Sequence, residues 1–220
     1  MADRPILFSG PMVRALLDGR KTQTRRTMPD QKLFRDGPAG PEIWTGFMGW
    51  QYLAWALDNR GVCGKGVLPR IAIGDRLYVR EHWNTDVRND GISPRDIRAT
   101  EPVWYIADGV STRSTDFSVR SSQHRQAMHM PRWASRLTLT VTDVRVERLQ
   151  DINEADAKAE GVSDEFTDYE IYGQSQPYRF GYSALWNDIN GPGAWDENPW
   201  VVAYTFTVQR GNIDQIGGAA

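Results

Sequence analysis

The segment at residues 135–152, "SRLTLTVTDVRVERLQDI", contains the longest run in which apolar and polar residues alternate. Alternation with a period of two is typical of a β-strand that buries one face. The apolar positions are odd-numbered over residues 137–141 and even-numbered over residues 144–146, so the phase shifts near residues 142–143. Such a slip indicates a bulge or a bend, which is common where a sheet curls into a barrel.

Shorter elements are expected on both sides of this strand. The pattern predicts further strands at residues 5–8, 22–27, 76–83, 102–108 and 198–210, and helices at residues 9–19, 153–161 and 182–190. Pro11 suits the first turn of the first helix, and Asn153 is a typical cap for the second. This order predicts an α+β fold, in which a mainly antiparallel, barrel-like sheet is flanked by short helices.

A single domain is expected over residues 1–210, followed by a flexible tail at residues 211–220. The chain has 220 residues, which is enough for one domain with a sizeable core. Residues 30–70, which are rich in Gly and Pro, and residues 85–125 are interpreted as insertions into this domain. Within the first insertion, "GWQYLAWALDN" predicts either a hairpin or a short helix.

Charge and cysteine content limit the classes of function. The 26 basic and 28 acidic residues give a formal net charge of −2, whereas proteins that coat nucleic acid nonspecifically are usually basic. Any contact with nucleic acid therefore requires a local basic patch. The single cysteine, Cys63, cannot form an internal disulfide or a Cys-rich zinc site, and no apolar stretch approaches the ~20 residues of a membrane span. We therefore expect a cytoplasmic protein with no membrane partner.

No metal ion and no cofactor are expected. The three histidines, His82, His124 and His129, show no paired metal-binding spacing and are interpreted as ordinary hydrogen-bonding residues. The chain also lacks the phosphate-binding loop, the dinucleotide-binding glycine pattern and the GxSxG nucleophile motif. These absences argue against kinases, P-loop enzymes, dinucleotide enzymes and ordinary serine hydrolases.

The densest basic patch is "GRKTQTRR" at residues 19–26. It has two interpretations. Basic residues are favoured at the C-terminal end of a helix, so the patch can be a solvated helix end. Alternatively, a lysine with a lowered pKa can act as a general base for a threonine nucleophile. Strict strand alternation would place Lys21 and Thr24 on opposite faces, so this second interpretation requires Lys21 to lie on the turn before the strand.

Three motifs in order carry a resemblance to a known family. "DGRKTQTRR", "GDRLYVREHW" and "TLTVTDVRVERLQDINEADAKAEGV" together resemble the ASCH domain family of the PUA-like superfamily. With "HMPRWASR" and "LWNDINGPGAWDENPWV", most of the chain looks like phage- and prophage-encoded ASCH-type proteins. The resemblance implies a PUA-like β-barrel with flanking helices and a cleft that accepts a nucleobase or RNA. It also implies the host cytoplasm as the location if the chain is phage-encoded.

The same resemblance implies a catalytic set. Some compact bacterial ASCH proteins are amidohydrolases that remove the acetyl group from acetylated cytidine with a lysine, a threonine and a glutamate. The family string "GRKTxTxR" matches here at Lys21 and Thr24. The best match to the glutamate is Glu160, with Glu154 and Glu81 as the alternatives.

Two functions are therefore carried forward. The first is an amidohydrolase for an N-acylated, acetylcytidine-like nucleoside or a modified nucleobase. The second is a non-catalytic module that binds RNA or a modified base, on which Trp83 or Trp133 would stack. In both, Arg25 and Arg26 would hold the phosphate or the ribose side, and Arg132 would face the same cleft as Lys21. The candidate substrate-binding residues are Arg25, Arg26, Glu81, Trp83, Arg132 and Trp133.

Overall fold

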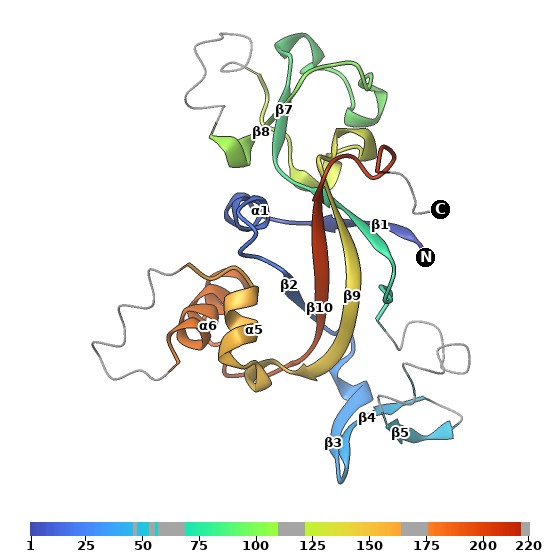
Figure 1. Ribbon diagram of the computed structural model, residues 1–220, viewed down its shortest axis with the longest axis vertical. Helices are drawn as coiled ribbons and strands as arrows, with labels where there is room; N and C mark the ends of the chain where they lie inside the picture. The colour runs from blue at the N-terminus through green and yellow to red at the C-terminus, as the bar shows by residue number, and fades with distance from the viewer. Residues whose placement is uncertain (46–47, 53–55, 57–68, 110–121, 164–175, 217–220) are drawn as a thin grey trace. The chain divides into compact units, whose positions relative to one another are not determined.

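The computed structural model describes residues 1–45, 48–52, 56, 69–109, 122–163 and 176–216 (Figure 1). The chain divides into two compact units. Unit 1 comprises Met1–Thr22, Gly74–Val141 and Phe206–Ala220, and unit 2 comprises Gln23–Ile73 and Thr142–Thr205. Two long strands, β9 (Leu137–Arg148) and β10 (Trp200–Arg210), pass from one unit into the other.

Unit 1 has the strand order β1-β6-β9-β10. In this unit β1 (Asp3–Leu7) pairs in parallel with β6 (Arg76–Arg80), and β6 pairs in antiparallel fashion with the first part of β9. The helix α1 (Gly10–Leu17) follows β1, with Pro11 in its first turn as predicted. A separate two-stranded sheet is formed by β7 (Trp83–Thr85) and β8 (Val103–Tyr105).

Unit 2 has the strand order β9-β10-β2, and β2 (Gln23–Thr27) is antiparallel to β10. The helices α5 (Glu154–Ala159) and α6 (Pro177–Asn190) lie side by side in this unit (Figure 1). A three-stranded antiparallel sheet is formed by β3 (Phe34–Gly37), β4 (Gly40–Trp44) and β5 (Trp50–Tyr52). The core of unit 2 consists of Leu149, Ile152, Ala157, Val162, Tyr182, Trp186 and Val201.

The shift of phase predicted in the long strand is confirmed. Leu137, Leu139 and Val141 are buried in the first part of β9, whereas Val144 and Val146 are buried in the second part. The boundary between the two units falls between these sets, after Val141. The slip therefore lets one continuous strand contribute apolar side chains to the core of each unit.

The prediction of an α+β fold is confirmed at this level. The described sheets are open, because β1 and β2 stand at the two ends of the five-stranded order and have no pairing with each other. Most strand pairs are antiparallel, and β1 with β6 is the parallel exception among the described pairs. None of the helices in the described part of the chain has the length and apolar character that crossing a membrane requires.

Several element boundaries differ from the expectation. The strand predicted at residues 76–83 is interrupted, because the chain changes partners: β6 pairs with β1 and β9, whereas β7 pairs with β8. The strand predicted at residues 102–108 ends at Tyr105 and continues as a 3-10 turn, Ile106–Asp108. The segment "GWQYLAWALDN" contributes the strand β5, and most of its remainder lies outside the described residues.

The first part of the predicted flexible tail is held in place. The side-chain amide nitrogen of Asn212 donates hydrogen bonds to the carbonyl oxygens of Arg132, Trp133 and Ser135, at 2.8, 3.0 and 2.9 Å. Ile213 is buried. Residues 211–216 therefore pack onto unit 1 rather than fray, and residues 217–220 lie outside the described part.

Candidate functional site

Lys21 belongs to unit 1 and follows α1 directly. Gly19, at φ 73°, turns the chain out of the helix, and the backbone N–H of Lys21 donates to the carbonyl oxygen of Ala15 at 3.0 Å. The residue is only 1% exposed, and its Nζ lies 5.6 Å from the centre of the Phe8 ring. A solvated helix end would leave this ammonium group in water, so that interpretation is wrong for Lys21.

Thr24 and Arg26 lie next to each other on β2 in unit 2. Thr24 is 1% exposed, and its hydroxyl oxygen accepts a hydrogen bond from Nη1 of Arg26 at 2.9 Å. Burial lowers the pKa of the Arg26 guanidinium, although Glu160, Tyr182 and Tyr204 act in the opposite direction. A hydrogen bond from a charged and poorly hydrated donor favours negative charge on the threonine oxygen.

Arg25 points into a cluster of carboxylates in unit 2. Its Nε and Nη2 donate to Oε1 of Glu147 at 3.0 and 2.7 Å, and Nη2 also donates to Oδ2 of Asp156 at 3.1 Å. Its Nη1 donates to Oε1 of Glu160 at 3.1 Å and to Oε1 of Gln23 at 3.2 Å. Burial alone would lower the pKa of Arg25, but Glu160 and Glu147 raise it overall.

This arrangement corrects the prediction that Arg25 holds a phosphate or ribose. A guanidinium has five N–H donors, and the protein accepts from all of them. The side chain is fully buried. Arg25 therefore has no donor left for a substrate, whereas the substrate-binding prediction for the half-buried Arg26 stays open.

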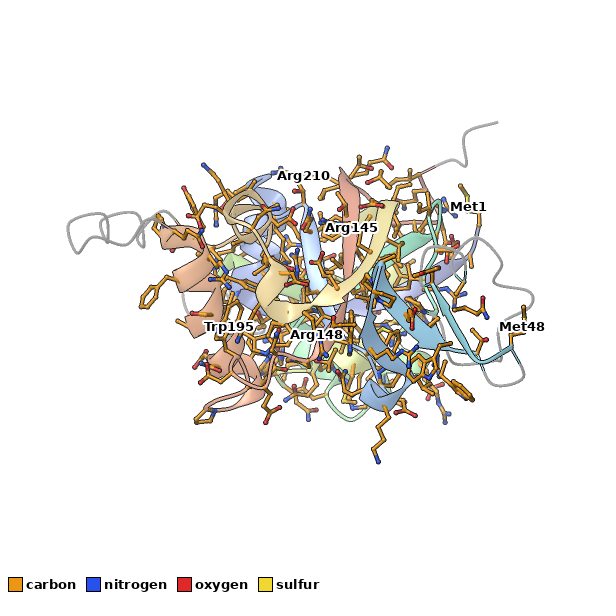
Figure 2. The ribbon with its side chains drawn as sticks, turned by 90° about the horizontal axis from the view of Figure 1, so that it is seen from below. Met1, Met48, Arg145, Arg148, Trp195 and Arg210 are labelled. Atoms are coloured by element: carbon orange, nitrogen blue, oxygen red, sulfur yellow. The ribbon has the colours of Figure 1, made fainter. Side chains whose placement is uncertain are left out.

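Further charged and polar groups border this cluster. Asp156 also accepts hydrogen bonds from Arg145 at 2.9 Å and from Gln23 at 2.9 Å. Burial alone would raise the pKa of Asp156, but these two bonds lower it overall. Burial, followed by the charge of Glu160, raises the pKa of Tyr182 well above its usual value. Arg145 and Arg148 both project from β9 in Figure 2, and of the two only Arg145 bonds to this cluster.

The three candidate carboxylates have different surroundings. Glu160 is buried in unit 2 and bonds to Arg25. Glu154 accepts from the backbone N–H groups of Tyr178 and Arg179 at 2.7 and 3.0 Å, so it caps the first turn of α6. Glu81 is bound to Arg136 in unit 1. Of the three, Glu160 shares a cluster with the neighbours of Thr24, which favours it as the site carboxylate.

Glu81 forms the centre of a second buried ion cluster, in unit 1. Its two carboxylate oxygens accept from Nε and Nη2 of Arg136 at 2.9 and 3.0 Å, and Arg136 also bonds to Asp108 at 2.7 and 2.9 Å. Burial raises the pKa of Glu81 although Arg136 opposes it, and burial raises the pKa of Tyr105 to about 12. Because Glu81 is 1% exposed and paired at both oxygens, its surroundings indicate a structural ion pair.

The two candidate stacking residues also belong to unit 1. Trp83 is 0% exposed and packs in a core cluster with Ile97, Met130 and Ala134. Its ring therefore has no face on which a base could stack, which corrects that prediction. Trp133 is partly buried against the same cluster, and its predicted role stays untested.

Arg132 is held by ion pairs near the start of β1. Its guanidinium bonds to Asp214 and, at 2.6 Å, to Oδ2 of Asp3 at the start of β1. Lys21 contacts Phe8, which follows the end of β1. Phe8 lies five positions after Asp3, which corresponds to about 16 Å along an extended chain. Arg132 also lies over the ring of Tyr78, which pairs with Pro5 in the middle of β1. That Arg132 shares a cleft with Lys21 therefore stays a prediction, although its ion pairs hold it near the start of the strand.

Two of the three histidines form a pair. Nδ1 of His82 lies 2.9 Å from Nε2 of His124, and the two ring centres are 4.9 Å apart. Over the described ranges, no group of three or more His, Cys, Asp and Glu side chains is placed to hold a metal ion. Cys63 lies outside those ranges.

The histidine pair predicts a pH dependence of stability. Burial, followed by the charge of His124, lowers the pKa of His82 in the folded state. The unfolded chain, in which a histidine titrates near ~6.5, then binds the proton of His82 more readily, so protonation of His82 costs stability as the pH falls below that value. We expect His124→Gln to reduce the loss of Tm between pH 7.5 and 5.5, and His129→Gln to leave it unchanged. Equal losses in the wild type and His124→Gln would contradict this expectation.

Several members of the Arg25 cluster are not among the sequence candidates: Gln23, Glu147, Asp156 and Tyr182. One signal was available for Asp156, because it precedes Glu160 by four residues on the predicted helix and thus lies on the same face.

Comparisons with protein-family models, curated proteins and solved structures found no match. The fold and this cluster therefore define a mixed α+β protein with a buried threonine beside an arginine–carboxylate network.

Proposed function

We propose that the protein is an amidohydrolase with a PUA-like barrel fold that acts on an N-acylated, acetylcytidine-like nucleoside. The observation that carries this proposal is the burial of Thr24 with the Arg26 guanidinium on its hydroxyl oxygen. A threonine hydroxyl is a weak nucleophile unless its negative form is stabilised or a base removes its proton. Here a charged donor is in place on that oxygen, and a buried lysine lies three positions earlier in the chain.

The proposed reaction has two steps. Thr24 attacks the acyl carbon of the substrate while its proton passes to the neutral amine of Lys21. The C–N bond then breaks, and Lys21 returns the proton to the leaving exocyclic nitrogen, which leaves an ester on Thr24. Water, deprotonated in the same way, hydrolyses the ester and releases acetate. Arg26 stabilises the charge on oxygen, and Glu160 orients Lys21.

The chain itself allows Lys21 and Thr24 to act together. Two residues separate them, so their Cα atoms are at most about 11 Å apart in any backbone conformation. Lysine has a long side chain with a terminal amine, which can cover much of that distance.

The test is an assay of the purified wild-type protein against a panel of nucleosides. The panel contains N-acetylcytidine, longer N-acyl cytidines, an N-acyl adenosine and an O-acetyl nucleoside as the ester control. We expect release of the free nucleoside from at least one N-acyl cytidine. If the protein hydrolyses no member of the panel, the proposal is contradicted.

A non-catalytic module that binds RNA or a modified base is the second candidate. One observation favours this candidate. Oε1 of Glu160 accepts a hydrogen bond from Arg25, a guanidinium whose donors are all used within the protein, so this oxygen belongs to the internal network. In that case the nucleoside panel gives no product, while titration of the same nucleosides and of single-stranded RNA gives measurable binding. The same protein sample can serve for both measurements, so the two candidates are separated directly.

A further inference from the structure

Arg25 stands at the centre of the buried cluster, although it has no free donor for a substrate. Two of its nitrogens, Nε and Nη2, bond to Glu147 and Asp156, whereas Nη1 bonds to Glu160 and Gln23. A guanidinium is planar and rigid. When two of its nitrogens are fixed on one side, the direction of the third is fixed as well.

The anchoring side of the guanidinium is itself held firmly. Asp156 is hydrogen-bonded by Gln23 and Arg145, and its backbone N–H donates to the cap residue Asn153 at 2.8 Å. Glu147 lies on the long strand β9. Gln23 closes the network, because its oxygen accepts from Arg25 while its nitrogen donates to Asp156. The plane of Arg25 is thus fixed by two elements of unit 2, α5 and β9.

Glu160 needs such support because of its position. It is the C-cap residue of α5, a helix of only six residues, and Gly161 follows it at φ 87°. The end of a short helix holds a side chain less firmly than a helix interior does. The bond from Nη1 of Arg25 to Oε1 of Glu160 supplies a direction that the backbone alone does not supply.

We propose that Arg25 is the positioning residue for Glu160, and that it influences turnover only through Glu160. This inference rests on the proposed amidohydrolase function, in which Glu160 orients Lys21. Arg25 itself touches no substrate and takes no proton. Its contribution is geometric. Because Nε and Nη2 are anchored on Glu147 and Asp156, Nη1 presents a donor to Oε1 of Glu160 in a fixed direction. A lysine ammonium lacks this planar geometry and would act only as a point charge.

The first test is Arg25→Lys, which keeps the charge and removes the fork. We expect kcat to fall about tenfold to a hundredfold, as for a misplaced site group, with KM close to the wild-type value. The matched control is Arg148→Lys. Arg148 lies on the same strand β9, is partly exposed and pairs with Asp36 rather than with the Arg25 cluster. It should keep wild-type kcat.

A double-mutant cycle separates positioning from general support of the fold. If Arg25 acts only through Glu160, Arg25→Lys causes no further loss of kcat in a Glu160→Gln background, within about twofold. Additive losses, or a wild-type kcat in a folded Arg25→Lys protein, would overturn the inference. If Arg25→Lys does not fold, Glu147→Gln replaces it, because this change loosens the anchoring side and leaves the bond to Glu160. It should then lower kcat without changing KM, and unchanged kcat would also overturn the inference.

Failure of the proposed function is distinguishable from failure of this inference. If the wild type hydrolyses no acyl nucleoside, crystal structures of the variants show the orientation of the Glu160 carboxylate directly. Arg25→Lys should leave this carboxylate rotated or spread over more than one rotamer, because the fixed donor from Nη1 is lost, and Arg148→Lys should leave it as in the wild type. An unchanged Glu160 rotamer in Arg25→Lys would overturn the positioning role independently of any activity.

Discussion

Thr24→Ala and Lys21→Arg are each expected to lower kcat for acyl-cytidine hydrolysis by at least about a thousandfold, since each removes one member of a group that acts as a unit. Alanine has no nucleophilic oxygen. Arginine keeps the positive charge of Lys21 but cannot act as a base in the physiological pH range. The measurement is steady-state release of free nucleoside, with enough enzyme to detect the residual rate. Thr24→Ser, which keeps a hydroxyl group, should retain part of the activity.

Matched controls lie in the same stretch of chain. Thr22→Ala removes a hydroxyl from an exposed threonine two positions from Thr24, and Lys32→Arg makes the lysine-to-arginine change at an exposed site. Both should keep wild-type kcat and KM. A wild-type rate in a folded Lys21→Arg protein would exclude the general-base role. If the wild type has no activity but binds RNA or a modified nucleoside, the binding module becomes the better interpretation.

The structure changes what the sequence suggests about the stability of these variants. From the sequence, neither Lys21 nor Thr24 is expected to be a core residue, so their substitution should cost little stability. Both are in fact buried, and Thr24 accepts a hydrogen bond. Thr24→Ala is therefore expected to cost about 1 kcal/mol. Thermal unfolding should be measured for every variant whose kinetics are measured. Lys21→Met serves as a second variant at position 21, because it does not enlarge the buried side chain.

Local features of the fold could be predicted because local sequence decides them. The alternation along β9 and its phase shift follow from the order of neighbouring residues. The side chain of Asn153 accepts from the backbone N–H of Asp156, as its position before an acidic first turn predicts. In such cases the interacting groups lie within a few residues, so the sequence contains the whole interaction.

The partners of Arg25 could not be predicted in the same way. Glu147, Asp156 and Glu160 lie 122, 131 and 135 positions further along the chain. A period-two pattern states which face of β2 carries Arg25, but not which helix or strand covers that face. The basic patch therefore has the same appearance in the sequence whether its arginines face water, a phosphate or buried carboxylates.

Tryptophan in a strand presents a similar ambiguity. Trp83 occurs in an alternating segment, and that pattern is the same for a core residue and for a stacking platform. Its complete burial depends on Ile97, Met130 and Ala134, which come from other segments. Exposure is a property of the packed molecule, so sequence alone could identify Trp83 as important but could not assign its role.

The second large effect is expected for stability, at the ion cluster of unit 1. Arg136→Met should lower the free energy of unfolding by about 3 kcal/mol, because it leaves the buried Glu81 carboxylate without its partner. This is the low end of the range for buried pairs, since the Arg136 side chain is 22% exposed. The corresponding fall in Tm is roughly 6–12 °C. Arg88→Met is the matched control, because Arg88 pairs with Asp86 at the surface, where water screens the pair, and its removal should leave the free energy of unfolding nearly unchanged.

The pH dependence of this effect identifies its cause. Burial raises the pKa of Glu81, and Arg136 opposes that rise, so the pKa in Arg136→Met should rise further. A carboxyl group whose folded pKa lies above its unfolded value binds a proton more readily in the folded state. The deficit of Arg136→Met should therefore be largest near pH 7 and shrink as the pH falls toward 5. Glu81→Gln combined with Arg136→Met should recover part of the stability at pH 7, because no buried charge remains. Denaturant titrations at three pH values measure both, and a deficit that is independent of pH would show that lost packing, rather than an unpaired carboxylate, is responsible.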